Sequence, residues 1–239
     1  MHLENLVVDA VEPQRLGSFW EAVVGAERLT DEPDVFETRL AVEGGPFLDL
    51  CFPRVPEPPA DPPRLHVELR GGARPAEEVD RLVGLGARRL DTDRPDVSGV
   101  LLADPEGNPF RVLADRPVHP GTGPLAALPL ACADPDRDAR LWAWLTGWTD
   151  VAGAAPRSLR HPSRLGPVLE LRPEPARKGA AKNRRHLDVR LETGEDPDEV
   201  AAGITGRGGR ELPPHVGGLP WRLYADPSGN EFCVLSARS

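Results

Sequence analysis

The residues best suited to chemistry lie in three short segments that alternate between polar and apolar side chains. These segments are 168–172, 186–191 and 231–235. In a β-strand every second side chain points to the same face, so the polar members of each segment share one face. Carboxylates and guanidiniums that face each other pair readily, and a histidine among them becomes a hydrogen-bonded partner. The polar members are Glu170, Arg172, His186, Asp188, Arg190, Glu231 and Cys233.

Other kinds of chemistry have no support in the sequence. The cysteines Cys51, Cys132 and Cys233 show no CxxC spacing, which argues against a disulfide scaffold and against a thiolate zinc site. The Gly-Gly pairs lack the strand–loop–helix context of a phosphate-binding loop. No serine stands in a nucleophile-elbow pattern. The remaining expectation is a polar pocket on a β-sheet.

A small basic cluster precedes the histidine segment. Lys182, Arg184 and Arg185 lie immediately before His186. Such a cluster is usually solvated where a strand begins, and the alternative is a gate for an anionic ligand. Trp221 opens another strand and, by alternation with Leu223, is expected to line the pocket.

Composition narrows the function classes. The 239 residues carry a net charge of −9 with a pI of about 5.2, which argues against binding to nucleic acid. Hydrophobic residues make up 39% of the chain and charged residues 28%, as in soluble globular proteins. No apolar run approaches the ~20 residues of a membrane span. The N-terminus lacks a signal-peptide pattern, so we expect a cytoplasmic protein.

The chain is an internal repeat. The motif Asp-Pro-x-Gly-Asn at 104–108 returns at 226–230, and Pro13/Pro135 and Trp20/Trp142 keep the same spacing. A period this long indicates two homologous domains rather than a solenoid. We predict domains at 1–116 and 125–239, joined by the Pro- and Gly-rich segment 114–124.

Each half of the repeat predicts the same succession of elements. An alternating strand is followed by an acidic residue and a proline, which favour a helix start, and the helix ends at a glycine. Strands, a second helix and a hairpin with the Asp-Pro-x-Gly turn follow. The order is β-α-β-β-β, twice per half. The expected strands include 5–11, 47–52, 65–69, 127–133, 168–172 and 186–191, and the second helices are expected at 75–85 and 197–204.

This organisation resembles the vicinal oxygen chelate superfamily, which contains the glyoxalase and bleomycin-resistance proteins. The resemblance rests on Phe19-Trp20, on 53–58, on 182–189 and on the two Asp-Pro-x-Gly-Asn hairpins. It implies an α+β fold of tandem glyoxalase-like domains. Each domain would contain two βαβββ modules that form a curved, mostly antiparallel sheet with helices outside. It also implies internal pairing of the domains, and a homodimer of such chains is equally open.

The resemblance also implies positions for the ligands of a divalent metal. In the first half these positions hold Asn5, Asp49, His66 and Pro109, and in the second half they hold Ala127, Glu170, His186 and Glu231. Proline cannot bind a metal, so the site of the first domain is degenerate. A site in the second domain, if occupied, would hold Ni, Zn, Co, Mn or Fe through His186, Glu231 and Glu170.

Two functions follow from this resemblance. We predict a small-molecule-binding protein of the glyoxalase/bleomycin-resistance type, without a complete catalytic metal site. The alternative is a metal-dependent lyase or isomerase in which Glu231 or Glu170 also acts as the catalytic base. In either case the first domain could serve only to complete the second. The residues expected to bind the ligand in the second-domain cavity are Arg172, His186, Asp188, Arg190, Trp221 and Cys233.

Overall fold

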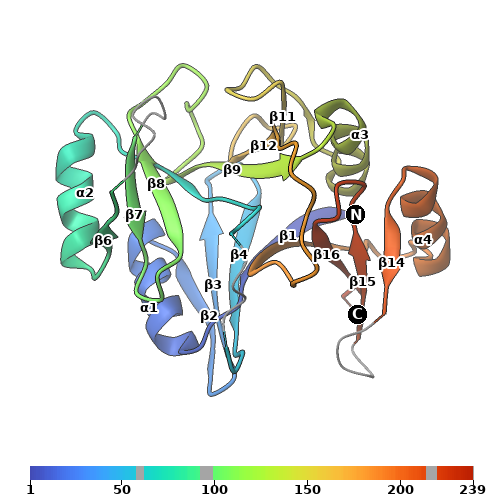
Figure 1. Ribbon diagram of the computed structural model, residues 1–239, viewed down its shortest axis with the longest axis horizontal. Coiled ribbons are helices and arrows are strands. Elements are labelled where there is room, and N and C mark those ends of the chain that lie inside the picture. The colour runs from blue at the N-terminus through green and yellow to red at the C-terminus, as the bar shows by residue number, and fades with distance from the viewer. Residues whose placement is uncertain (58–61, 92–98, 214–219, 239) are drawn as a thin grey trace.

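The computed structural model describes residues 1–57, 62–91, 99–213 and 220–238. These residues form two eight-stranded sheets with four helices outside them (Figure 1). The predicted α+β class and the βαβββ modules are therefore confirmed. No helix in the described part of the chain has the length and apolar character that a membrane span requires.

Each half of the chain contains two βαβββ modules. The elements of the first half are β1 (His2–Val8), α1 (Pro13–Val24), β2 (Glu27–Glu32), β3 (Val35–Ala41), β4 (Phe47–Pro53), β5 (Glu68–Arg70), α2 (Pro75–Gly84), β6 (Arg88–Arg89), β7 (Val100–Ala103) and β8 (Pro109–Leu113). Those of the second half are β9 (Leu125–Cys132), α3 (Pro135–Thr146), β10 (Thr149–Asp150), β11 (Arg157–Arg160), β12 (Val168–Pro173), β13 (Arg185–Arg190), α4 (Pro197–Gly206), β14 (Arg210–Leu212), β15 (Trp221–Ala225) and β16 (Glu231–Leu235). The segment 114–124 between the halves contains no helix or strand.

Both sheets combine strands from both halves. The first sheet has the order β14-β15-β16-β13-β1-β4-β3-β2, and the second has β10-β11-β12-β9-β5-β8-β7-β6. We call them sheet A and sheet C. The halves meet where β1 pairs with β13 and where β5 pairs with β9, both antiparallel. The parallel pairs are β1/β4, β13/β16, β12/β9 and β5/β8. The chain thus pairs its two domains internally, the first module with the fourth and the second with the third.

The repeated hairpin motif is explained by a buried carboxylate. Asp104 accepts hydrogen bonds from the backbone and side-chain nitrogens of Asn108 and from Trp20 Nε1 at 3.2 Å. Asp226 accepts the equivalent bonds from Asn230 and, at 3.3 Å, from Trp142 Nε1. The motif therefore fastens the last hairpin of each half to that half's first helix, which explains why tryptophan and aspartate recur together.

Helix packing follows the predicted alternation. Leu187 and Val189 of β13 and Phe232 and Val234 of β16 lie in the main hydrophobic core. On the same face of sheet A, in the strands of the first half, α1 approaches β3 so closely that a Cβ at Gly17 would lie 2.1 Å from the Phe36 ring. We call the sheet face turned away from the helices the inner face.

Both predicted helix starts are confirmed, but only one acidic N-cap residue makes a side-chain capping bond. Asp134 caps α3, because its carboxylate accepts a hydrogen bond from the backbone nitrogen of Arg137. Glu12 makes no such bond at α1. The carboxylate of Glu106, in the hairpin between β7 and β8, instead accepts from the backbone nitrogens of Val11 and Glu12. Gly25 and Gly147 end the two helices with positive φ, as predicted.

Candidate functional site

The inner face of sheet A carries a row of polar residues that crosses four strands. In the strand register Asp49 of β4 lies beside Asn5 of β1, Asn5 lies beside Asp188 of β13, and Asp188 lies beside Cys233 of β16. All four side chains face the same way because they occupy equivalent positions in the pleat. The row therefore draws two residues from each half of the chain.

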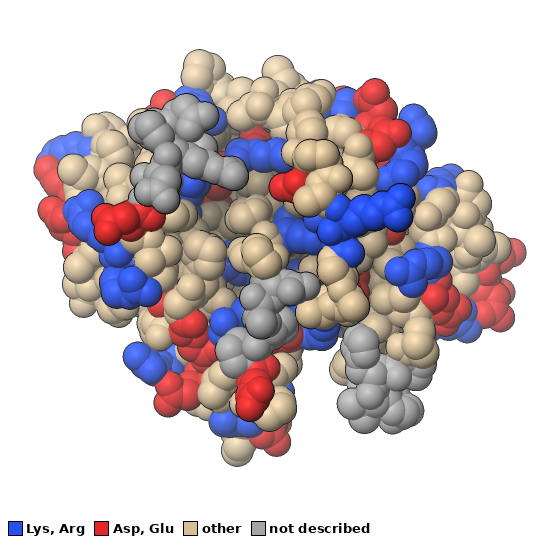
Figure 2. All heavy atoms as spheres, viewed as in Figure 1, with Lys and Arg blue, Asp and Glu red and all other residues tan. Residues whose placement is uncertain are grey.

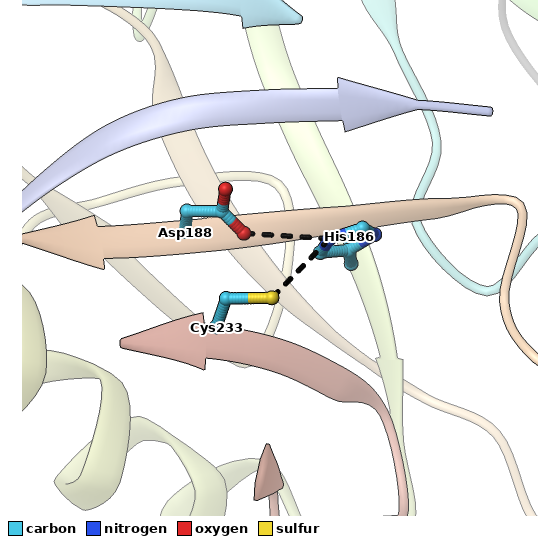
Figure 3. Close-up of side chains that lie close together, drawn as sticks. All are labelled: His186, Asp188 and Cys233. Carbon is cyan, nitrogen blue, oxygen red and sulfur yellow. Dashed lines mark hydrogen bonds and ion pairs between the residues drawn. The ribbon is translucent and has the colours of Figure 1, made fainter. Parts of the chain in front are cut away.

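His186, Asp188 and Cys233 form a compact cluster within this face (Figure 3). His186 Nε2 lies 3.4 Å from Asp188 Oδ1 and 3.7 Å from Cys233 Sγ. The second carboxylate oxygen, Oδ2, accepts a hydrogen bond from Asn5 Nδ2 at 3.1 Å. All three residues of the cluster are less than a tenth exposed. Prediction from the sequence placed these three side chains on one polar face, and the structure brings them together.

Burial dominates the electrostatics of this cluster. It raises the pKa of Asp188 to about 7, although hydrogen bonds from Asn5 and Cys233 act in the opposite direction. Burial also raises the pKa of the Cys233 thiol, and the neighbouring Asp188 carboxylate raises it further. In the described part of the chain no lysine or arginine forms an ion pair with Asp188. Near neutral pH this carboxyl group is therefore only partly ionised.

Glu231 is not part of the cluster. Its carboxylate forms an ion pair with Lys178 at 2.7 Å and accepts a hydrogen bond from the backbone nitrogen of Asn183 at 3.3 Å. Lys178 belongs to the connection between β12 and β13, and the ammonium group neutralises the carboxylate that we expected to bind a metal or to act as a base.

Glu170 and Arg172 lie in the other sheet. They are on β12 of sheet C, where Arg172 bridges Glu170 at 2.6 Å and Glu68 of β5 at 3.0 Å. The expected metal set of His186, Glu231 and Glu170 is therefore not assembled. The prediction was wrong because it placed the whole site in the second half of the chain, whereas the inner face of each sheet is built from both halves. Arg172 likewise does not join His186 at a common site.

The other predicted ligand-binding residues have separate surroundings. The Arg190 guanidinium holds Glu4, with Nη2 2.6 Å from its carboxylate, and also donates to the carbonyl of Ser236. Trp221 is 38% exposed and lines a pocket of about 300 Å³ at the end of sheet A, beside Leu191 and Val234. Leu191 and Val234 belong to the main hydrophobic core, on the helix-facing side of the sheet. Trp221 thus lines a pocket that His186 does not line.

Two members of the basic cluster before His186 are each paired with a separate carboxylate. Lys182 pairs with Asp9 at 2.6 Å, and Arg184 pairs with Glu106 at 2.6 Å. Figure 2 shows basic side chains gathered right of centre, where the connection between β12 and β13 crosses this face. Arg185 is different, because it is only 2% exposed and its Nη1 donates a hydrogen bond to the carbonyl of Pro109 at 2.9 Å. Burial lowers the pKa of Arg185 to about 10.

The residues of sheet C that correspond to the cluster in the repeat have different charges around them. There His66 corresponds to His186, Glu68 to Asp188 and Arg111 to Cys233 in the repeat. His66 is exposed to solvent, and partial desolvation of its ring together with nearby guanidiniums lowers its pKa. Sheet C therefore holds a network of arginines and carboxylates around a neutral histidine.

Sequence reasoning missed two features that shape the site. The first is Lys178, whose position in a Pro- and Gly-rich connection gave no signal that it reaches Glu231. The second is a small apolar cluster beside the polar one, separate from the main core. It consists of Leu212, Leu223, Cys233 and Leu235. Alternation along β15 and β16 could have located it, because Leu223 and Leu235 share the inner face with Cys233.

The pairing of βαβββ modules into two curved sheets, each with a polar inner face, is the architecture expected of the vicinal oxygen chelate superfamily. The sequence profile described as "Glyoxalase-like domain" matches residues 5–113 and again residues 127–235. The chain belongs to this glyoxalase-like family and carries the domain in tandem.

Solved structures agree on the fold. Glyoxalase I from Zea mays superimposes with a TM-score of 0.69 at 15% sequence identity, covering 98% of this chain and 92% of that chain. A putative dioxygenase from Bacillus subtilis gives a TM-score of 0.60 at 15% identity, covering 100% of this chain and 86% of that one. No curated protein matches the sequence. At such identities the likeness establishes the fold, so the function must be argued from the residues.

Proposed function

We propose that this protein binds a small molecule over the inner face of sheet A. The observation that carries the proposal is the buried carboxylate of Asp188, whose Oδ1 accepts no hydrogen bond of good geometry within the described part of the chain and lies 3.4 Å from His186 Nε2. Leaving a buried acceptor unsatisfied costs about 1–3 kcal/mol. A ligand that donates a hydrogen bond to Oδ1 recovers that free energy, and His186 at 3.4 Å supplies a second polar contact.

The surroundings of Asp188 fit a ligand with both polar and apolar parts. Leu223 and Leu235 lie beside Cys233 on the inner face and belong to a cluster separate from the main core. Small-molecule sites combine an apolar wall with a few polar groups that fix the orientation of the ligand. A glycopeptide or a small aromatic compound with neighbouring oxygen atoms would meet both requirements, with its oxygens at Asp188 and its apolar part against the leucines.

The proposal is tested by ligand-induced thermal stabilisation in the presence of EDTA, which separates ligand binding from metal binding. The probes are bleomycin, as a glycopeptide, and catechol, as a small aromatic compound with vicinal oxygens. A ligand that binds only the folded state raises Tm in proportion to its occupancy. We expect at least one probe to stabilise the wild-type chain.

The matched variants are Asp188→Asn and Glu68→Gln, which make the same chemical change at equivalent positions of the two sheets. Loss of a hydrogen bond to a charged group is worth about 1.5–3 kcal/mol, so Asp188→Asn is expected to weaken binding by about tenfold or more. Glu68→Gln is expected to leave it unchanged. The proposal is overturned if neither probe, nor a broader panel of such compounds, stabilises the wild type. Equal weakening by both variants would also overturn it.

A further inference from the structure

The metal positions implied by the family resemblance are not available in this structure. Sheet A brings together Asn5, Asp49, His186 and Glu231 from the two halves. Arg39 holds the Asp49 carboxylate through two hydrogen bonds of 2.7 Å, and Lys178 holds that of Glu231. With both carboxylates already paired to cations, this set does not suit a divalent ion.

The neighbouring cluster has the spacing of metal ligands. A tetrahedral zinc ion has bonds of about 2.0–2.1 Å to nitrogen or oxygen and about 2.3 Å to sulfur, which place N and O ligands about 3.4 Å apart and N and S ligands about 3.6 Å apart. In the structure His186 Nε2 lies 3.4 Å from Asp188 Oδ1 and 3.7 Å from Cys233 Sγ. The three ligand atoms form the one such group of three in the described part of the chain.

We propose that His186, Asp188 and Cys233 bind a zinc-type divalent metal ion, at a site shifted along β13 and β16 from the positions that the resemblance implies. Of the positions that the resemblance implies, the proposed site retains only His186. Asp188 takes the place of a carboxylate from another strand. Cys233 takes the place of Glu231, which lies two residues before it on β16. A donor set of imidazole, carboxylate and thiolate favours zinc or cobalt over magnesium or calcium, which take oxygen ligands.

The charge at the cluster supports this assignment. Asp188 is 5% exposed, its Oδ1 accepts no hydrogen bond, and in the described part of the chain no lysine or arginine pairs with it. Its Oδ2 accepts a hydrogen bond from Asn5, which holds the carboxylate in place. Figure 3 shows the other oxygen of the carboxylate pointing toward His186. Hydrogen bonds that orient a ligand in this way are typical of metal sites. A bound cation would neutralise Asp188 and favour the thiolate form of Cys233.

The second sheet supplies an internal contrast. At the equivalent positions of the repeat, Arg111 stands where Cys233 stands in sheet A, and His66 is surrounded by guanidiniums. A guanidinium cannot bind a cation. The chain should therefore bind a single equivalent of metal, in sheet A.

The test is titration of the untagged, reduced full-length chain with Co²⁺, followed by optical absorption. A thiolate ligand gives a charge-transfer band in the near ultraviolet, and a tetrahedral site gives strong visible bands. We expect both bands to saturate at a single equivalent and to disappear when Zn²⁺ is added. Cys233→Ser should abolish the charge-transfer band, and Asp188→Asn should weaken Co²⁺ binding at least tenfold.

The matched controls are the two other cysteines. Cys132→Ser changes a buried thiol that contacts the Arg172 carbonyl, and Cys51→Ser changes a thiol on the inner face of sheet A outside the cluster. Both should bind Co²⁺ as the wild type does. Absence of the charge-transfer band in the wild type overturns the proposal, and so does its survival in Cys233→Ser or its loss in either control. Because the ligand assay of the proposed function contains EDTA, either proposal can fail while the other stands.

Discussion

Replacement of Asp188 by asparagine should stabilise the metal-free protein, and the gain should depend on pH. Burial raises the pKa of this carboxyl group from its ordinary 3.8 to about 7. The folded state therefore holds the proton more tightly than the unfolded state. Well below pH 3.8 both states are protonated and the group contributes nothing. As pH rises from about 4 to 7 the unfolded state ionises first, so the free energy of unfolding falls.

The size of the effect follows from the two pKa values. One pKa unit corresponds to about 1.36 kcal/mol, so a rise from 3.8 to about 7 corresponds to at most ~4 kcal/mol at pH 7.5 and above. Asparagine is neutral at every pH, and its side-chain oxygen can still accept the hydrogen bond from Asn5. The variant should exceed the wild type by less than ~1 kcal/mol near pH 4 and by up to ~4 kcal/mol above pH 7.

The assay is urea denaturation of both proteins in EDTA at several pH values between 4 and 8. Burial also raises the pKa of Asp226, to about 6, so the wild-type curve alone would mix two titrations. The difference between variant and wild type cancels the contribution of Asp226, because that residue is the same in both. A difference that does not change with pH, or a variant that is less stable above pH 7, would refute the reasoning.

Two further predictions concern the boundary between the halves. Arg185→Leu should raise the free energy of unfolding by about 1–4 kcal/mol, because the buried Nε and Nη2 of Arg185 have no hydrogen-bond partner among the described residues and Leu65 fills the equivalent position of the repeat. A lower Tm in thermal denaturation would contradict this. A protease site inserted at the exposed Asp115, in the segment between the halves, should be cleavable without separating the fragments, because β1/β13 and β5/β9 hold the halves together. Size-exclusion chromatography of the cleaved protein would contradict this by resolving two half-sized species.

Local patterns predicted the elements and the orientation of their side chains. The alternation of His186, Asp188 and Cys233 with aliphatic or aromatic neighbours depends only on the pleat of one strand, and it gave the correct face. The repeated tryptophan and Asp-Pro-x-Gly-Asn motif marked the two hairpins. Their shared physical cause, the bond from the indole to the buried carboxylate, became visible only in the structure.

The composition of the site could not be predicted in the same way. Glu170 and His186 lie 16 residues apart in the sequence, yet strand pairing puts them in different sheets. Asn5 and Asp188 lie at opposite ends of the chain and share a hydrogen bond. Pairing of this kind depends on the register of strands from distant segments. The ion pair between Glu231 and Lys178 likewise depends on the path of the long connection between β12 and β13, whose sequence has no helix or strand periodicity.

The exchange of modules between the sheets also limits how this gene can change. Loss of the second repeat would expose the edges of β1 and β5 in an isolated first half, and bare strand edges promote aggregation unless another chain covers them. A new specificity on sheet A would have to arise by compensating mutations in the first and last quarters of the coding sequence. Among related sequences, substitutions at positions 5 and 49 should therefore correlate with substitutions at positions 188 and 233, which lie in the same sheet. This correlation should be stronger than the correlation of either pair with other positions in its own half of the chain.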